Sequence, residues 1–242
     1  GAGASALILD HVSALGSETL PLASVLGRVL AREVRSPVAL PPWDNASMDG
    51  YAVRATDVAK ATREHPVALP VFGTIAAGAE TPPPLERGGA MRIMTGAPIP
   101  QGADTVIRVE DTDRGVDRVA IFDARDASRN VRPAGEDLAE GHIAVSSGTV
   151  IGPAQLGVLA SVGAATVEVR RIPRVGILAS GDEPVDLDGF DEVRRGRRIV
   201  SRNSYTMRAC VALSGGEPVN LGIVGDDREL LRARFLRARE ER

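Results

Sequence analysis

Two apolar runs near the C-terminal end of the sequence, "RVGILAS" (174–180) and "PVNLGIV" (218–224), constrain the fold most. Apolar residues are nearly continuous in both, which is typical of strands buried on both faces of a parallel sheet. The pattern predicts a helix at 204–213 between the runs and another from 228 onward. This β-α-β-α order begins a doubly wound sheet. Two parallel strands do not make a domain, so we expect the chain to be cut before this fold is complete.

The preceding sequence predicts mainly β structure. Short apolar runs alternate with Gly and Pro turns over 48–109, with a further strand at 115–123, as in a compact barrel-like unit. Helices are predicted at 5–15 and 153–160, and the proline-rich stretch 37–46 indicates a crossing between units. The fold class is therefore multi-domain, α+β and α/β. Its predicted parts are an N-terminal helical segment (1–26), a β-rich linker domain (27–45 with 138–172), a β-barrel-like domain (46–137) and an incomplete α/β domain (173–242).

Composition argues against several classes of function. Aromatic residues make up 3% of the chain and the formal net charge is -3, which disfavours base-stacking platforms and phosphate-backbone binding. The single cysteine, Cys210, rules out an intrachain disulfide and is expected in a helix core, and the three histidines lack zinc-site spacing. No apolar run is long enough to span a membrane, and no signal peptide pattern is present. We expect a soluble, cytoplasmic protein that binds neither nucleic acid nor membrane.

Acidic residues follow both predicted parallel strands. Asp182 and Glu183 follow the first strand, and Asp226 and Asp227 follow the second. Ligands of open α/β sheets bind at the carboxyl ends of strands. Clustered carboxylates there suit Mg²⁺, which in turn can hold phosphate or oxyanion groups. One of Asp226 and Asp227 is equally well explained as the N-cap of the next helix, with Glu229 completing a capping box.

Three further candidate site residues lie in the β-rich part, and each also has a purely structural explanation. Asp49 precedes Gly50, a pair most often found in turns. Thr95 ends a predicted strand before a Gly-Ala-Pro turn, where its hydroxyl commonly bonds the turn backbone. Asp137 ends "NVRPAGED", where a solvated charge cluster around Arg132 is the alternative. Residues alone therefore indicate acidic loops at strand ends without defining a reaction.

Five segments taken together resemble the molybdopterin molybdenumtransferases, the MoeA and gephyrin E-domain family. They are "PPWDNASMDGYAV", "MRIMTGAPIPQGADTVIRVED", "NVRPAGEDLAEG", "PRVGILASGDE" and "VNLGIVGDD", in the family's order and at its approximate spacing. Each segment alone is weak evidence, and the five in order are highly specific.

The resemblance implies an elongated multi-domain chain that forms a homodimer, with an active cleft shared between the α/β domain of one subunit and the β domain of the other. It places catalytic Asp49, Thr95 and Asp137 on one side of that cleft. It places Glu183 and Asp226, which would also hold Mg²⁺, on the other side. The substrate-binding residues that it implies are Ser180, Gly181, Asp182, Asn203 and Ser204.

The implied activity is a Mg²⁺-dependent transfer in which molybdate is used to insert molybdenum into adenylylated molybdopterin and AMP is released. A molybdopterin adenylyltransferase and recipient molybdoenzymes are the implied partners. The alternative is a catalytically impaired dimeric scaffold of the gephyrin E-domain type. Retention of the four acids Asp49, Asp137, Glu183 and Asp226 favours the enzyme.

Two departures from the family pattern stand out. Family members carry Asp-Ser-Asn or Asp-Thr-Asn where this chain has "SRN", so Ser201 replaces an acid while Asn203 fits. The family's glycine-serine-rich segment and its C-terminal β domain have no counterpart in this sequence. The first departure is expected either to alter nucleotide or pterin binding or to mark a divergent branch of the family.

Overall fold

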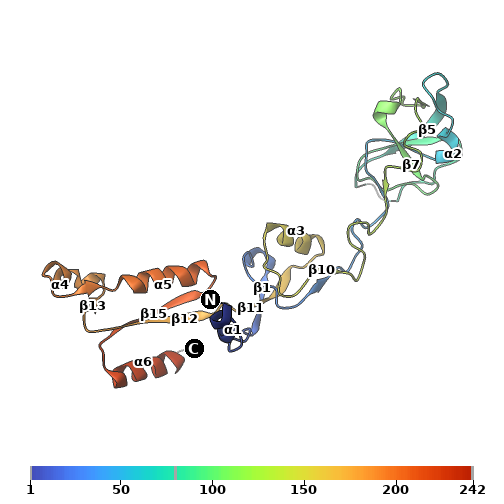
Figure 1. The fold of residues 1–242 in the computed structure, drawn as a ribbon. Coiled ribbons are helices and arrows are strands. Elements are labelled where there is room, and N and C mark those ends of the chain that lie inside the picture. The colour runs from blue at the N-terminus through green and yellow to red at the C-terminus, as the bar shows by residue number, and fades with distance from the viewer. Residues whose placement is uncertain (1, 79–80, 241–242) are drawn as a thin grey trace. The chain divides into compact units, whose positions relative to one another are not determined.

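The computed structural model describes residues 2–78 and 81–240 of the chain. They divide into two compact units (Figure 1): unit 1 comprises residues 1–33 and 146–242, and unit 2 comprises residues 34–145. The finer four-part division expected from the sequence stays a prediction. Among the described residues, none of the helices combines the length and apolar character that a membrane crossing requires.

Unit 2 is built on a mixed five-stranded sheet, as the alternating runs predicted. The strand order is β7-β4-β6-β5-β8, and only the β5–β6 pairing is parallel. Two short antiparallel pairs, β2–β10 and β3–β9, accompany it. The strands are β2 (Val34–Arg35), β3 (Asn45–Ala46), β4 (Gly50–Val53), β5 (Val67–Ile75), β6 (Ala90–Ile93), β7 (Thr105–Arg108), β8 (Arg118–Ile121), β9 (Val131–Arg132) and β10 (Ile143–Val145), with α2 (Ala55–Val58) and η2 (Val109–Asp111) between them.

Both faces of strand β4 are buried, because its side chains alternate between two apolar clusters. Tyr51 and Val53 enter one cluster, and Ala52 enters the other. The sequence therefore builds a core on each side of the sheet from Val, Ile, Leu and Ala, with Tyr51 as the largest fully buried side chain.

Gly50, the first residue of β4, is required by the close approach of β7. A Cβ atom at Gly50 would lie 2.0 Å from the carbonyl oxygen of Ile107. The Asp49-Gly50 pair is therefore the entry to a central strand. The glycine lets that strand begin directly after the acid.

We predict that Gly50→Ala lowers the free energy of unfolding of unit 2 by about 3 kcal/mol, because backbone must move to relieve the overlap. Chemical denaturation followed by the fluorescence of Trp43, which lies in unit 2, measures the change. The control is Gly157→Ala in a helix of unit 1, where nothing lies within 4 Å of the added carbon. An unchanged midpoint for Gly50→Ala would contradict the packing described.

The first part of unit 1 joins the N-terminal region to residues 146–170. Strand β1 (Ser17–Pro21) pairs antiparallel with β11 (Thr166–Arg170). Helix α1 spans Ala2–Leu9, η1 spans Leu22–Ser24, and α3 spans Pro153–Ser161, close to its predicted bounds. The predicted helix at 5–15 is wrong at its end, since the helix stops at Leu9 and the chain then enters β1. Residues 10–16 form a turn and an irregular connection, because the chain must leave the helix before β1 begins at Ser17.

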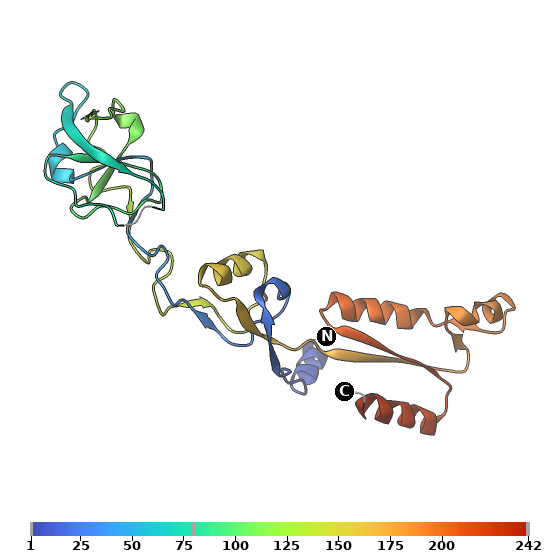
Figure 2. The ribbon, with the colours of Figure 1, turned by 180° about the vertical axis from the view of Figure 1, so that it is seen from behind.

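The second part of unit 1 has the predicted β-α-β-α order. Strand β12 (Arg174–Ser180) pairs parallel with β15 (Glu217–Val224). Helices α5 (Arg202–Leu213) and α6 (Arg228–Glu240) cover opposite faces of the pair (Figures 1 and 2). A segment between β12 and α5 contains β13 (Pro184–Val185), η3 (Leu187–Gly189), α4 (Phe190–Arg194) and β14 (Ile199–Val200).

Burial in this part is lower than the apolar runs predicted. In β12 only Ile177 is buried. Cys210, expected in a helix core, is exposed on α5. The cause is that, among the described residues, β12 and β15 each have a neighbouring strand on one edge only.

Candidate functional site

The parallel pairing of β12 and β15 brings their two carboxyl ends together. Ser180 is in register with Val224, and the Gly181 N–H donates to the Val224 carbonyl at 3.0 Å. One residue further on, Asp182 Oδ1 accepts the N–H of Asp226 at 3.2 Å. Asp182 thus ties the loop after β12 to the loop after β15. Its role in this structure is to hold the two acidic loops together.

The two acids after β15 have different roles. Asp227 Oδ1 accepts the N–H groups of Glu229 at 2.8 Å and Leu230 at 3.0 Å, so Asp227 is the cap of α6. The Asp226 carboxylate forms no hydrogen bond or ion pair with any of the residues described. The cap alternative left open by the sequence is therefore correct for Asp227, and Asp226 keeps its carboxylate available.

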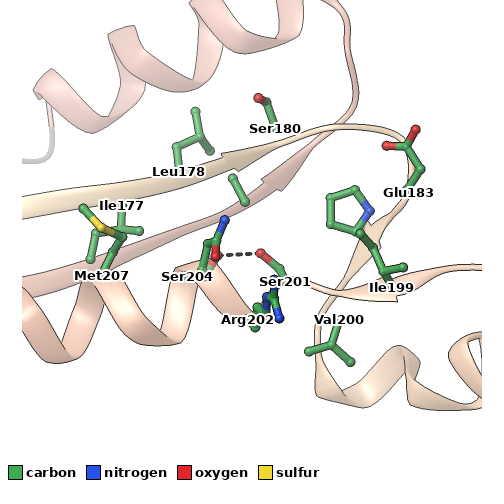
Figure 3. Close-up of a pocket in the computed structure, with 13 residues that line it drawn as sticks. Ile177, Leu178, Ser180, Glu183, Ile199, Val200, Ser201, Arg202, Ser204 and Met207 are labelled. Atoms are coloured by element: carbon green, nitrogen blue, oxygen red, sulfur yellow. Dashed lines mark hydrogen bonds between the residues drawn. The ribbon is translucent and has the colours of Figure 1, made fainter.

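A pocket of about 460 Å³ lies next to these loops, between the end of β12 and the first turns of α5. Figure 3 shows Glu183 on the loop after β12, and Ser201 and Ser204 at the start of α5. Four predicted residues line it together: Ser180, Glu183, Asn203 and Ser204. Gly181, Asp182 and Asp226 border the same strand ends without lining the pocket. The lining residues that the sequence did not indicate are Ile177, Leu178, Ala179, Pro184, Ile199, Val200, Arg202 and Met207.

Ser201 is buried at the base of α5, and its hydroxyl pairs with that of Ser204 at 2.7 Å (Figure 3). It does not cap the helix through its side chain. Arg202 follows it, and Arg202 and Glu183 are the charged side chains of the pocket lining. Within the described chain, neither has a side-chain hydrogen bond or an ion pair. The pocket therefore offers one cationic and one anionic group to a ligand.

Whether Mg²⁺ can bind at these strand ends depends on the oxygen ligands that the described residues offer. The described ranges contain no cluster of three or more His, Cys, Asp or Glu side chains that could hold a metal ion. Mg²⁺ in phosphoryl-transfer sites is commonly held by one or two carboxylates together with substrate phosphates and waters. Glu183 and Asp226, both with free carboxylates, match that donor set, and a phosphate-bearing ligand would supply further oxygens.

In unit 2, Asp49 and Thr95 form a close pair. Asp49 Oδ1 accepts both the backbone N–H and the hydroxyl of Thr95, each at 2.7 Å. The sequence left open that Asp49 only forms a turn with Gly50 and that the Thr95 hydroxyl only bonds the turn backbone. In the structure the hydroxyl bonds the carboxylate of the residue immediately before β4, and Asp49 Oδ2 is left without a protein donor in the part of unit 2 that is described.

The Thr95 N–H is the main cause that lowers the pKa of Asp49 below 3.8, followed by the Thr95 hydroxyl; Arg92 adds a smaller attraction. A lowered pKa in the folded chain means that the pair stabilises the fold above pH 3.8. That contribution is lost as the pH falls through the lowered pKa.

We predict that Thr95→Val raises the pKa of Asp49 only part of the way back to 3.8, because the valine keeps the N–H donor and removes the hydroxyl. Carbon-13 NMR of the Asp49 carboxyl measures it. Thr62→Val, which removes a hydroxyl that accepts from the His65 N–H, is the control. Either an unchanged pKa or a full return to 3.8 would contradict the two-donor description.

Asp137 is the third predicted residue of unit 2, and it lies in an exposed charge cluster. Both of its carboxylate oxygens accept from Arg132 Nη2 at 2.8 Å, while Arg132 Nε donates to Glu136 at 2.8 Å. These contacts raise the pKa of Arg132, with the Glu136 hydrogen bond as the largest cause. The solvated cluster expected as the alternative is present, with one arginine neutralised by two acids.

Geometry thus defines a chain with a mixed β unit and a parallel α/β pair, whose carboxyl edge carries acidic loops and a pocket lined by one anionic and one cationic side chain. A family model described as "MoeA N-terminal region (domain I and II)" matches residues 2–163. The chain belongs to this MoeA family.

Named relatives agree with that assignment. The chain is 40% identical over 221 residues to "Molybdopterin molybdenumtransferase 2" of Mycobacterium tuberculosis, covering 91% of this chain and 54% of the relative. It is 35% identical over 215 residues to "Molybdopterin molybdenumtransferase" of Bacillus subtilis, covering 87% and 49%. The chain therefore spans about half the length of the curated relatives it matches.

Solved structures show the same fold. A molybdopterin biosynthesis MoeA protein from Pyrococcus horikoshii OT3 matches with a TM-score of 0.90 at 31% identity, over 97% of this chain and 62% of that one. A second structure of a Pyrococcus MoeA protein matches with a TM-score of 0.81 at 34% identity, over 97% and 59%. The predicted fold class, a MoeA-like chain with β-rich N-terminal regions and an α/β part, is confirmed.

Proposed function

We propose that the chain acts as a molybdopterin molybdenumtransferase in molybdenum cofactor biosynthesis. The substrates would be molybdate and adenylylated molybdopterin, and AMP would be released. The observation that carries the proposal is the pocket at the carboxyl edge of β12, where Glu183 and Arg202 are both unpaired among the described residues. A phosphate ester with a bound cation meets both charges. We take the identity of the pterin, molybdopterin, and of the transferred metal, molybdenum, from the name of the relatives.

Glu183 and Asp226 are proposed to hold Mg²⁺ and through it the phosphates of the adenylylated ligand. When bound, Mg²⁺ would neutralise negative charge that develops on phosphate oxygens. Without an intervening cation, the two carboxylates would repel an anionic substrate. Asp182 keeps the two loops in place through the Asp226 N–H. Ser180, Asn203 and Ser204 would bind the ligand from the pocket wall.

Asp49 and Asp137 are proposed to orient the group that is exchanged. The Thr95 hydroxyl already donates to Asp49, so we assign Thr95 the role of fixing that carboxylate rather than donating to an oxyanion. This leaves Asp49 Oδ2 facing a ligand. Arg132 would hold the Asp137 carboxylate in place through its two hydrogen bonds.

Arg202 and Ser201 change the charge of the pocket relative to the family pattern. A neutral, buried Ser201 stands where the family resemblance implies an acid, and the guanidinium of Arg202 follows it directly. Compared with that pattern, the pocket lacks the negative charge at position 201, and Arg202 gives it a positive charge at the next position. This composition favours a more anionic ligand end, such as a phosphate, at the start of α5.

The homodimer is also a proposal. In it, Asp49, Thr95 and Asp137 of one copy would act on a substrate held by Glu183 and Asp226 of the other. A molybdopterin adenylyltransferase would supply the substrate, and recipient molybdoenzymes would take the product. Sedimentation of the purified chain would show whether the dimer forms.

The proposed activity is tested by molybdate-dependent AMP release from adenylylated molybdopterin with Mg²⁺ present. We predict release by the chain and a loss of about a hundredfold in Glu183→Gln, because a neutral amide binds Mg²⁺ much more weakly than a carboxylate does.

Asp191→Asn is the matched control. It removes an exposed carboxylate that pairs with Arg194 and does not line the pocket, so its rate should equal that of the parent. Full activity in Glu183→Gln would remove Glu183 from the site. No release by the parent chain would contradict the proposed function and favour a binding role.

A further inference from the structure

The segment from Pro184 to Val200, which we call the excursion, forms one wall of the pocket. It leaves the sheet after Glu183 and returns immediately before α5. Pro184 at one end and Ile199 with Val200 at the other line the pocket. The two ends are joined by the short β13–β14 pair.

Backbone hydrogen bonds hold the two ends of the excursion to each other. The Ile199 N–H donates to the Glu183 carbonyl at 3.1 Å, and the Ser201 N–H donates to the Val185 carbonyl at 2.9 Å. These bonds place the wall beside Glu183. Only two residue pairs are in register in β13–β14, so this pairing is weak without further support.

That support comes from Asp186 and Tyr205. Asp186 Oδ1 accepts the Leu187 N–H at 2.7 Å, which starts η3, and it also accepts the Tyr205 hydroxyl at 2.5 Å. Tyr205 lies on α5, and the guanidinium of Arg208 lies 5.9 Å from the centre of its ring. In the described part of the chain, this is the only side-chain hydrogen bond between the excursion and α5.

The contact connects the two segments that carry the proposed binding residues. Asp186 lies three residues after Glu183, and Tyr205 directly follows Ser204. Neither lines the pocket. Their hydrogen bond lies outside the pocket lining. A change in the distance between Asp186 and Tyr205 would move Glu183 relative to Ser204.

We propose that Asp186 and Tyr205 are positioning residues, whose hydrogen bond sets the width of the pocket and so its affinity for the phosphate-ester end of the ligand. This inference rests on the proposed function for the identity of the ligand. The mechanical part, that the bond holds the excursion against α5, stands without it.

Charge states support a persistent contact at neutral pH. The Tyr205 hydroxyl, then the Leu187 N–H, lower the pKa of Asp186, and Arg208 lowers it further. The hydrogen bond to Asp186 raises the pKa of Tyr205, and Asp188 also raises it. The acceptor is therefore ionised while the donor keeps its proton, which strengthens the hydrogen bond.

The test compares Tyr205→Phe, which removes only the hydroxyl, with Asp186→Asn, which keeps an acceptor oxygen. Thr206→Val is the matched control, because the Thr206 hydroxyl bonds the Arg202 carbonyl within α5. Two quantities are measured in the whole chain: hydrogen exchange at the Ile199 and Ser201 amides, and the dissociation constant of AMP.

We expect Tyr205→Phe to speed exchange at these two amides about tenfold by favouring local opening, with no change in β15. AMP should bind several-fold more weakly, Asp186→Asn should be intermediate, and Thr206→Val should match the parent. Unchanged exchange in Tyr205→Phe would overturn the inference whatever the function. Faster exchange with unchanged AMP affinity would overturn the positioning role. Failure of AMP to bind the parent would overturn that role as well, and would count against the proposed function too.

Discussion

The parallel hydrogen bonding of β12 and β15 is the constraint on which the α/β site depends. Because the two strands run in the same direction, the acidic loops that follow them emerge at one edge of the sheet. The bond from the Asp226 N–H to Asp182 then fixes the spacing of these loops. Glu183 and Asp226 keep free carboxylates there because Asp182 and Asp227 satisfy the local backbone donors. Two of the four neighbouring acids, Asp182 and Asp227, therefore bind backbone N–H groups, and the other two, Glu183 and Asp226, remain available to a ligand.

In unit 2, backbone packing and one hydrogen-bonded pair hold the Asp49 carboxylate in position. Gly50 lets β4 begin against the Ile107 carbonyl, which places Asp49 at the strand entry. Two donors from Thr95 then hold one oxygen of Asp49 and keep the carboxyl ionised. One packing requirement and one hydrogen-bonded pair therefore explain why an acid and a glycine stand together at the start of β4.

Much of this arrangement follows from the sequence. Apolar runs bounded by Gly, Pro and acids predicted the strands of unit 2 and the β-α-β-α order, since strand and helix periodicities are local. The helix at 5–15 was predicted too long, because local spacing does not show that the chain turns after Leu9 to reach β1, whose partner β11 lies far away in the sequence. Burial of β12 and of Cys210 was overestimated, because apolar character does not show how many neighbours an element has. Asp186 and Tyr205 gave no motif signal, since their contact exists only once the excursion folds back on α5.

The central claim is that acids of both units act on one substrate, with each unit supplied by a different copy of the chain. Co-expression of Asp49→Asn and Glu183→Gln chains, followed by molybdate-dependent AMP release, tests it most directly. Each variant alone should release AMP far more slowly than the parent, whereas mixed dimers contain one cleft with both native acids and should regain activity. If the mixture stays as inactive as the separate variants while both chains remain folded and dimeric, the claim of a shared site is wrong.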